Sequence, residues 1–466
     1  NNKLIFFDDK IFLMNGEINI GNFIFGGQQI KFDYKNFLFE FHKNSIMSFI
    51  DKQKKIISSS RIYFDTGYLK IDSCNNKSGL STINDYPKFK LSKGGFFSYK
   101  NKPPCFNLEP FEINYLNDIS VFNLSFKGYL NFLVNDSNYV SELRFDDSFN
   151  LSTKINDIKS LYIFDNNVEF SGDIDMSILG TRARGKFKSK LLEFSSNELE
   201  LNSFQIFGKV DSIKSGVLLD ETPFFSLKSN LSYFPNDDKF LFNNSVGDIF
   251  LYDKYSLRGD IFFDGQFLNG SGSLNSKKSI IESSHHYFSK NSIMSGDSNC
   301  KFFKDDTTNL IFDISSASVE NFISEDSILI YSSISDFRIP EINHYLNFDC
   351  ANINFENDYV KFYNSDYQSP GNITVSTRKN KLIYQGEEAI YKWKSKTFNV
   401  ENVYPIEINN KVFQPYNNYI SYSNSIFNYL FTKGTLIKNR RLFKDKLYNG
   451  VNLKILPSLK FSLIKA

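Results

Sequence analysis

The chain has 466 residues, of which 54 are basic and 52 acidic, and its formal net charge is +2 at pH 7. This near balance gives no electrostatic support for a nucleic-acid-binding protein, which normally presents a strongly basic face. The length exceeds that of one ordinary compact core, so two to four structural units are expected. The 51 Phe and 26 Tyr favour half-buried strands.

Four cysteines stand far apart in the sequence, and no CxxC pair occurs. Zinc sites usually use such pairs, so no structural zinc, other metal or cofactor is predicted. One or two disulfides in an oxidising compartment and four free thiols are both open alternatives for Cys74, Cys105, Cys300 and Cys350. No apolar run approaches the roughly 18 residues of a membrane helix, so no transmembrane segment is predicted. Because the sequence starts at Asn1, we expect a processed chain or a fragment.

Residues 1–102 are predicted to form short strands, as an N-terminal β-repeat unit. Apolar residues alternate with polar ones over residues 18–41, and this period of two is typical of antiparallel strands with one buried face. Gly26-Gly27 predicts a turn or a bulge in that stretch. Residues 45–57 are the only segment that fits a helix, as an alternative to a strand. Pro103-Pro104 ends the unit, because proline donates no N–H to a sheet.

Alternation resumes in residues 103–245, which we predict to be a β-sheet unit with the first copy of a longer repeat. Residues 234–240, FPNDDKF, predict a turn there. Residues 246–335 are predicted to be a second β-sheet unit with the second copy. Within it, Asp264-Gly265 stands between apolar residues, the pattern of a two-residue hairpin.

Each copy of that repeat opens with Gly-Asp-Ile, reaches another glycine thirteen residues later, passes an apolar-apolar-Glu triplet and closes on a glycine. The triplets match only after a two-residue insertion. We predict one structural unit used twice, with its paired glycines in equivalent turns. The matched residues are Gly172, Gly185, Leu191-Leu192-Glu193 and Gly208 in the first copy and Gly259, Gly272, Ile280-Ile281-Glu282 and Gly296 in the second.

A shorter duplication lies in residues 336–466, the predicted C-terminal duplicated hairpin unit. It follows the pattern L-x-[FY]-x-small-x-x-apolar-x-[FY] at an offset of 36 residues. We interpret it as a strand, a tight turn and a returning strand, the kind of repeat that stacked β architectures leave in a sequence. The matches are Leu346, Phe348, Cys350, Ile353 and Phe355 with Leu382, Tyr384, Gly386, Ala389 and Tyr391.

These patterns predict an all-β fold with little helix. A two-stranded hairpin cannot bury its apolar face alone, so we expect an elongated stack of antiparallel hairpin repeats, β-jellyroll-like or solenoid-like. The Phe-rich faces of consecutive hairpins then meet inside.

Three stretches carry a resemblance to known proteins. The first has the phrase L-x-[FY]-x-x-x-x-A-x-Y followed by a valine and a proline, the second begins PFEI, and the third reads LNGSGSLNSKKSIIES. Together they resemble a large, poorly characterised family of secreted or envelope proteins of Bacteroidota, although Cys350, Ile353 and Gly386 replace small alanines of its pattern. The resemblance implies an envelope location and offers no catalytic residues. The matching residues are Leu382, Tyr384, Ala389, Tyr391, Val403 and Pro415, then Pro110, Phe111, Ile113 and Leu116.

The short unit is also similar to the β-jellyroll repeat of lipopolysaccharide-transport proteins. Those proteins form an open apolar groove that shields acyl chains. This second resemblance implies that inward Phe and Tyr side chains would contact lipid.

Few residues suggest chemistry. His285-His286 invites a metal or acid–base interpretation, but adjacent strand residues point to opposite faces, so we expect plain surface near a turn. The alternate aspartates of residues 172–177 are interpreted as one strand face. Acidic pairs in turn-like settings are interpreted as turn residues that bond their own backbone. No catalytic residue is therefore predicted. The pairs are Asp8-Asp9, Asp146-Asp147, Asp237-Asp238 and Asp305-Asp306.

Two further features have a binding interpretation and a simpler one. Trp393 with Tyr391 and Tyr404 could stack on a sugar, but core packing is the expected role. A basic cluster near the C-terminus could meet lipid headgroups or an acidic glycan, but a solvated hairpin face is expected. The cluster is Lys433, Lys438, Arg440, Arg441, Lys444 and Lys446.

The sequence thus predicts a non-catalytic structural or scaffold protein of a bacterial cell envelope, periplasmic or on the extracellular face of the outer membrane. Its expected partners are other envelope proteins or lipid, with an apolar groove as an optional feature. One alternative is a surface adhesin or glycan-binding module. A second is a β-helix polysaccharide-degrading enzyme, which would need two carboxylates in one cleft.

Overall fold

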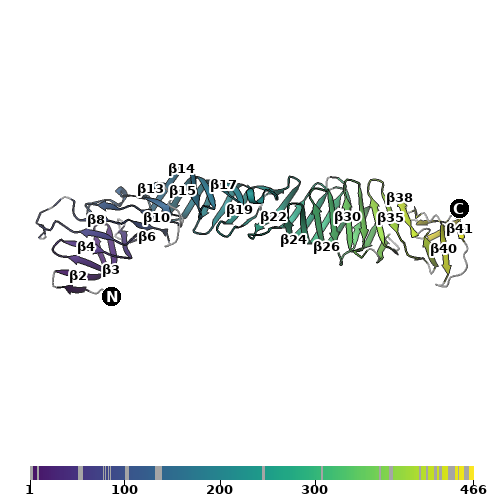
Figure 1. Ribbon diagram of the computed structural model, residues 1–466, viewed down its shortest axis with the longest axis horizontal. Coiled ribbons are helices and arrows are strands. Elements are labelled where there is room, and N and C mark those ends of the chain that lie inside the picture. The colour runs from purple at the N-terminus through teal and green to yellow at the C-terminus, as the bar shows by residue number, and fades with distance from the viewer. Residues whose placement is uncertain are drawn as a thin grey trace. The chain divides into compact units, whose positions relative to one another are not determined.

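The computed structural model of the chain is all-β, with 65% of its residues in strands and 3% in short helical turns (Figure 1). The predicted all-β, antiparallel hairpin fold with little helix is therefore confirmed. No helix among the described residues is long and apolar enough to span a membrane. The structure describes every residue except 1–3, 8–9, 51–55, 77, 79, 82, 84, 100–103, 132–138, 244–246, 306–307, 367–368, 377–380, 409–410, 416–417, 424–427, 430–432, 439–446, 450, 456–460 and 466.

The chain divides into two compact units, and each is described separately. Unit 1 comprises residues 1–218 and 228–240, and unit 2 comprises residues 219–227 and 241–466. The four units predicted from the sequence stay a prediction.

Unit 1 is built of strands that range from 3 residues in β9 to 13 residues in β14. Residues 45–50 form a strand, so the helical alternative for this segment is wrong there. The elements are β1 (Leu4–Phe7), β2 (Ile11–Ile20), β3 (Phe23–Asp33), β4 (Leu38–Phe41), β5 (Ser45–Ile50), β6 (Ile56–Phe64), β7 (Gly67–Lys70), β8 (Lys88–Leu91), β9 (Gly95–Phe97), β10 (Cys105–Leu108), β11 (Phe111–Ile113), η2 (Val121–Asn123), β12 (Ser125–Asn131), β13 (Val140–Phe145), β14 (Leu151–Ile163), β15 (Val168–Ser177), β16 (Gly180–Ser189), β17 (Leu192–Leu201) and β18 (Ile206–Ser215).

Three elements contain residues of both units, namely η3 (Val217–Leu219), β19 (Phe224–Phe234) and β20 (Lys239–Asn243). Unit 2 continues with β21 (Ile249–Leu251), β22 (Tyr255–Phe263), β23 (Leu268–Asn275), β24 (Ser279–Phe288), β25 (Ser292–Phe303), β26 (Leu310–Phe322), β27 (Ser327–Tyr331), β28 (Phe337–Ile339), η4 (Pro340–Ile342), β29 (His344–Asn347), β30 (Cys350–Asn354), β31 (Tyr359–Tyr363), β32 (Gly371–Ser376), β33 (Lys381–Gly386), β34 (Glu388–Lys392), β35 (Thr397–Glu401), β36 (Ile406–Ile408), β37 (Lys411–Pro415), β38 (Ile420–Ser423), β39 (Asn428–Tyr429), β40 (Lys433–Lys438), β41 (Leu447–Asn449), β42 (Val451–Ile455) and β43 (Phe461–Lys465).

Aromatic rings fill the N-terminal core of unit 1. Phe89 lies 4.7 Å from Phe25 and 5.4 Å from Phe64, measured between ring centroids, and Phe41 lies 5.9 Å from Phe25. All four side chains are buried. Burial of a Phe side chain contributes roughly 1.5–3 kcal/mol, so this cluster anchors the strands around it.

The longer repeat is real, but its glycines lie within strands rather than at turns. Gly172 pairs with Gly185 between β15 and β16, and Gly259 pairs with Gly272 between β22 and β23. The partners in each pair are so close that a Cβ atom at Gly272 would lie 2.3 Å from the carbonyl oxygen of Arg258. The predicted equivalence is therefore correct, and the predicted turn setting is wrong.

A serine on the next strand completes the same bulge in both copies. Gly185 pairs with Ser196 and Gly272 with Ser283, with a register shift beside each glycine. The hydroxyl of Ser196 donates to the carbonyl of Lys209, and that of Ser283 donates to the carbonyl of Gly296. Each hydroxyl thus donates a hydrogen bond to a backbone carbonyl at the β-bulge, where the regular hydrogen bonding between the strands is interrupted.

One offset of 87 residues relates all of these positions, which corrects two further matches from the sequence. No insertion is needed, because Phe187 opposite Phe194 in the first copy corresponds to Leu274 opposite Ile281 in the second. The Leu-Leu-Glu and Ile-Ile-Glu triplets therefore differ in register by two residues. The closing glycines are not equivalent either, since the counterpart of Gly296 is Lys209.

Strands β27 to β35 of unit 2 form two layers. In one layer β27 pairs with β30, β30 with β31, β31 with β34 and β34 with β35. In the other, β28 pairs with β29, β29 with β32 and β32 with β33. Fully buried rings fill the space between the layers, as Phe337 of β28 lies 5.2 Å from Phe362 of β31.

This layering corrects the shorter duplication. Its two predicted strands, β29 and β30, lie in different layers and do not form a hairpin. The equivalent residues are 38 rather than 36 apart, since Leu346 and Tyr384 both lie opposite Ile373. A shift of two residues keeps every side chain on its own face, which is why the sequence pattern matched at the wrong offset.

Consecutive turns of the first layer stack on one another. The N–H of Trp393 donates to the carbonyl of Asp358, and the N–H of Phe355 donates to that of Asp326, at 3.3 and 3.4 Å. The ring centroids of Phe355 and Trp393 are 6.0 Å apart. Lys394 also pairs with the Asp358 carboxylate at 2.5 Å. The turns thus hold neighbouring hairpins in register.

Glu341 of η4 joins the turn between β34 and β35 to the rest of unit 2. Its carboxylate accepts bonds from Lys304 at 2.5 Å, Tyr391 at 2.6 Å and Lys396 at 2.9 Å. Burial alone would raise the pKa of Glu341, but these three donors outweigh it and lower the pKa to about 2. The carboxylate is therefore a stabilising group that is ionised in the folded protein.

We expect Glu341→Gln to lower the free energy of unfolding by about 1–2 kcal/mol at pH 7, because one strong acceptor for two ammonium groups is lost. A pKa depressed on folding gives stability above the ordinary value near 4.5 that disappears as the pH falls towards 2. Urea unfolding at pH 7 and pH 2.5 measures this. Equal stability of Glu341→Gln and wild type at pH 7 would contradict the assigned role.

The four cysteines are free thiols, so the disulfide alternative does not hold. Cys74 is exposed and Cys105 half-buried, whereas Cys300 and Cys350 are buried. Burial raises the pKa of the Cys300 thiol to about 12. A thiol in this state is a poor nucleophile and behaves as a small apolar core residue.

Candidate functional site

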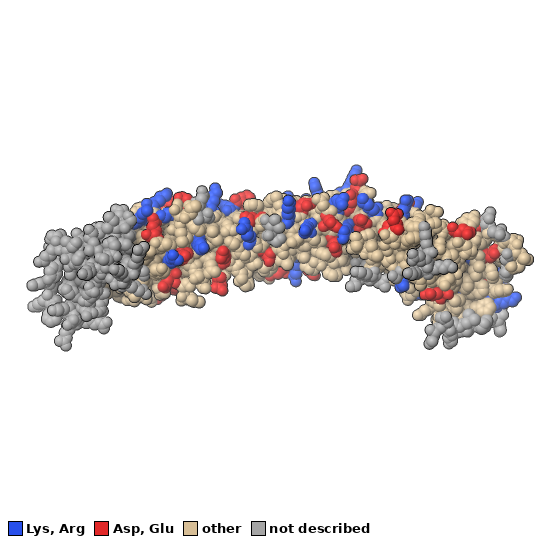
Figure 2. Space-filling view, turned by 180° about the vertical axis from the view of Figure 1, so that it is seen from behind, with Lys and Arg blue, Asp and Glu red and all other residues tan. Residues whose placement is uncertain are grey.

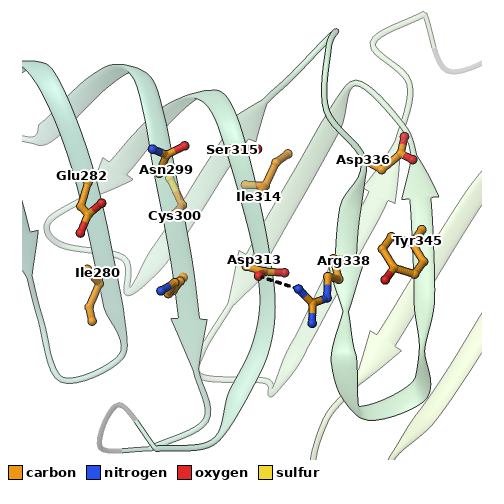
Figure 3. A pocket seen from close by; sticks show the side chains of 11 residues that line it. Ile280, Glu282, Asn299, Cys300, Asp313, Ile314, Ser315, Asp336, Arg338 and Tyr345 are labelled. Atoms are coloured by element: carbon orange, nitrogen blue, oxygen red, sulfur yellow. Dashed lines mark ion pairs between the residues drawn. The ribbon is translucent and has the colours of Figure 1, made fainter.

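A shallow depression of about 360 Å³ lies on the outer face of unit 2, over strands β24, β25, β26, β28 and β29 (Figure 3). Its central row crosses the strands, with Lys301 opposite Asp313, Asp313 opposite Arg338 and Arg338 opposite Tyr345. The Asp313 carboxylate forms an ion pair with Arg338 at 3.6 Å, drawn as a dashed line in Figure 3. Alternating charge across adjacent strands makes this face polar.

The three carboxylates of this depression come from separate elements. Glu282 lies on β24, Asp313 on β26, and Asp336 precedes β28 and accepts a bond from Asn347 at 2.8 Å (Figure 3). Asp313 is paired with a guanidinium rather than with a second carboxylate, unlike the acid–base pair of a glycosidase. Within the described residues, no group of three or more His, Cys, Asp or Glu side chains could hold a metal ion.

A second depression of about 380 Å³ lies over the other ends of β24, β25 and β26 and is closed by β27. We call it the aromatic cleft, after Tyr287 and Tyr331, which form its walls together with Met294. Its floor is Gly296, where an added Cβ would meet no atom within 4 Å. Met294 and Tyr331 are about half exposed, at 46% and 45%. Polar groups from Asn269, His285, Ser318 and Glu320 line the remaining sides.

The histidine pair predicted as plain surface divides between two environments. Both residues lie within β24 rather than at a turn, and only His285 is exposed. His286 is 1% exposed, and its ring bonds the Ser295 hydroxyl at 2.7 Å and the Gly272 carbonyl at 3.0 Å. Burial lowers the pKa of His286, partly offset by the bond to Gly272. The surface prediction is therefore wrong for His286.

Other residues singled out in the sequence are structural. Trp393 and Tyr391 are buried, as expected for core packing, while Tyr404 is 39% exposed. Asp146 bonds the backbone N–H groups of Ser148 and Asn150, as expected at a turn.

Three predictions fall partly or wholly outside the described residues. Asp8-Asp9 and Asp306 lie outside them, as do four members of the basic cluster, namely Arg440, Arg441, Lys444 and Lys446. The backbones of Lys433 and Lys438 belong to β40. Figure 2 shows Lys and Arg interspersed with Asp and Glu on the face that it draws, so that view gives no broad basic surface of the kind that nucleic acid requires.

Sequence reasoning missed the aromatic cleft, because its residues come from five strands that are brought together only by folding. The available signals were the pair His285-His286 and the Tyr287 that follows it. A comparison with family models, with curated proteins and with solved structures gives no match for this chain.

Proposed function

We propose that the chain is a non-catalytic structural or scaffold protein of a bacterial cell envelope. The observation that carries this proposal is the repeat, in which the same glycine pair and the same serine bond are built twice, 87 residues apart. Repetition of one unit extends a β-structure without a new core. A repeated β unit presents surface residues at regular intervals, and a scaffold protein needs such intervals to hold its partners at fixed positions.

The interior supports a scaffold more than a lipid carrier. In unit 2 the rings of Phe312, Phe337 and Phe362 lie 5.2–6.0 Å apart, and all are fully buried. This part of the described core gives an acyl chain no interior groove to enter. The proposal therefore leaves lipid shielding out.

The envelope location rests on the resemblance carried by residues 382–415. It is part of the proposal, together with the expectation that the partners are other envelope proteins. A periplasmic location and a location on the outer surface are both consistent with it.

A complementation experiment tests the proposal against the enzyme alternative. Cells that lack the chain receive either wild type or a variant with three amide replacements, Glu282→Gln, Asp313→Asn and Asp336→Asn. A scaffold is expected in the envelope fraction, and the amide variant should restore the lost phenotype as well as wild type does, because its shape is unchanged. A cytosolic location, or failure of a stably folded amide variant to complement, would contradict the proposal.

A further inference from the structure

The aromatic cleft contains side chains that the repeat does not need for folding. At the positions 87 residues earlier, the first copy carries Arg182, Glu198 and Lys209 in place of Asn269, His285 and Gly296. Arg182 and Glu198 form an ion pair, and their side chains cover the surface at the positions where the second copy has the aromatic cleft. The same backbone thus forms with a charged, filled surface in one copy and an open, aromatic one in the other.

The buried histidine beneath the cleft shows the same contrast. Its counterpart in the first copy is Leu199, which is fully buried. An apolar side chain therefore satisfies this position, whereas a histidine requires two partners to offset its desolvation. His286 has them in Ser295 and the Gly272 carbonyl. Ser295 and Gly296 are consecutive on β25, so His286 fixes the strand that forms the cleft floor and is a positioning residue.

The chemistry of the walls defines the ligand. Tyr287 and Tyr331 offer ring faces for apolar C–H groups, and the Phe267 ring, 5.5 Å from that of Tyr287, extends this surface. The Asn269 amide, one of whose N–H groups already donates to the Phe267 carbonyl at 3.1 Å, and the Ser318 hydroxyl are donor groups, and the Glu320 carboxylate is an acceptor. A ligand with an apolar face and hydroxyls that both donate and accept meets all of these groups. A quaternary ammonium ion would use the rings and Glu320 but no donor.

An apolar face with surrounding hydroxyls is the chemistry of a sugar, and the width of the cleft indicates a ligand with more than one sugar ring. Tyr287 lies on β24 and Tyr331 on β27, three strand spacings apart, which is about 14 Å across the sheet. The volume of about 380 Å³ lies within the usual range for small-ligand pockets. We propose that the aromatic cleft binds a neutral oligosaccharide, with its ring faces on Tyr287 and Tyr331 and its hydroxyls at Glu320 and Asn269.

Gly296→Lys is the sharpest test, because it introduces the residue that the first copy carries at this position. The chain is titrated calorimetrically with four neutral hexasaccharides, namely cellohexaose, laminarihexaose, mannohexaose and chitohexaose, each up to about 5 mM, where a millimolar Kd is measurable. We expect at least one of them to bind wild type and Gly296→Lys to weaken it at least tenfold. Asn299→Lys adds the same charge on β25 outside the cleft and should change the Kd less than twofold.

A second variant keeps the test decisive if Gly296→Lys does not fold. Tyr331→Ala removes one exposed ring and should weaken the same hexasaccharide about tenfold, or by about 1.4 kcal/mol, because the sugar loses a face on which it stacks. Absence of binding by all four sugars would overturn the proposal. So would binding that a folded cleft variant leaves unchanged, or cleft-dependent binding of tetramethylammonium without any sugar.

Discussion

Gly272→Ala should destabilise unit 2 by about 3 kcal/mol or more. The residue has a φ of +124°, which side chains rarely adopt, and its new Cβ would lie 2.3 Å from the Arg258 carbonyl oxygen and 2.9 Å from the Gly259 Cα. Backbone strain of this kind contributes about 1–3 kcal/mol. The overlap adds to it, because both of these atoms belong to the paired strand and can move only by opening the ladder.

Gly296→Ala is the matched control. Gly296 lies two strands away from Gly272, and its carbonyl accepts the hydrogen bond from Ser283, the residue that pairs with Gly272. Its Cβ would meet no atom within 4 Å, so we expect its unfolding free energy to stay within about 0.5 kcal/mol of wild type. Thermal and urea unfolding of both variants measure the difference. Similar stabilities for the two alanine variants would contradict the claim that the close approach of Gly259 and Gly272 requires glycine at position 272.

Acid should destabilise the protein by about 3 kcal/mol through His344 alone. The side chain is 0% exposed in β29, with its ring 4.8 Å from that of Phe398 and its Nδ1 2.6 Å from the Ile342 carbonyl oxygen. Burial lowers the pKa of His344 to about 4, although the bond to Ile342 opposes this. The ordinary value is near 6.5, and each pKa unit corresponds to about 1.4 kcal/mol.

The sign follows from proton binding. Below pH 6.5 His344 binds a proton in the unfolded chain, whereas in the folded protein it binds one only near pH 4. The free energy of unfolding is therefore highest above pH 6.5 and decreases as the pH falls from 6.5 to 4. Urea unfolding at pH 7.0 and pH 4.5 measures the loss. His344→Phe removes the titrating group, and its stability should fall less over this range. An equal fall in wild type and His344→Phe would contradict the assignment.

The sequence was sufficient for the fold class and for the equivalence of the two opening glycine pairs of the longer repeat. Gly172 and Gly185 are separated by thirteen residues because they face each other across a hairpin, and that spacing survives in the second copy. The interpretation of these glycines as turns failed because spacing alone does not distinguish a turn from a mid-strand bulge. The φ values and the close approach of paired backbones decide it.

The layers of unit 2 were beyond what the sequence could show. Alternation tells which face of a strand is buried but not which strand lies beside it. β29 pairs with β32, which begins more than twenty residues later, while β30 belongs to the other layer. The match at 36 residues was off by two because alternation is unchanged by such a shift.

The aromatic cleft escaped sequence reasoning for the same reason. Its residues are spread from Asn269 to Tyr331 and have no common motif. Only the offset of 87 residues exposes them, by showing that Lys209 and Leu199 hold the places of Gly296 and His286. An internal repeat is thus a built-in control for separating residues that form the fold from residues with another role.

Residues 172–258 and 259–345 begin with the same structural unit. Deletion of residues 173–259 tests it most directly, because Gly172 is then followed by Asp260 and the Gly-Asp-Ile sequence is restored at the junction. Circular dichroism and urea unfolding of this shortened chain measure the outcome. We predict a β-rich spectrum and a cooperative transition with a smaller m-value, since one whole repeat is lost and the pairing is preserved. A non-cooperative transition or an unfolded spectrum would contradict the claim.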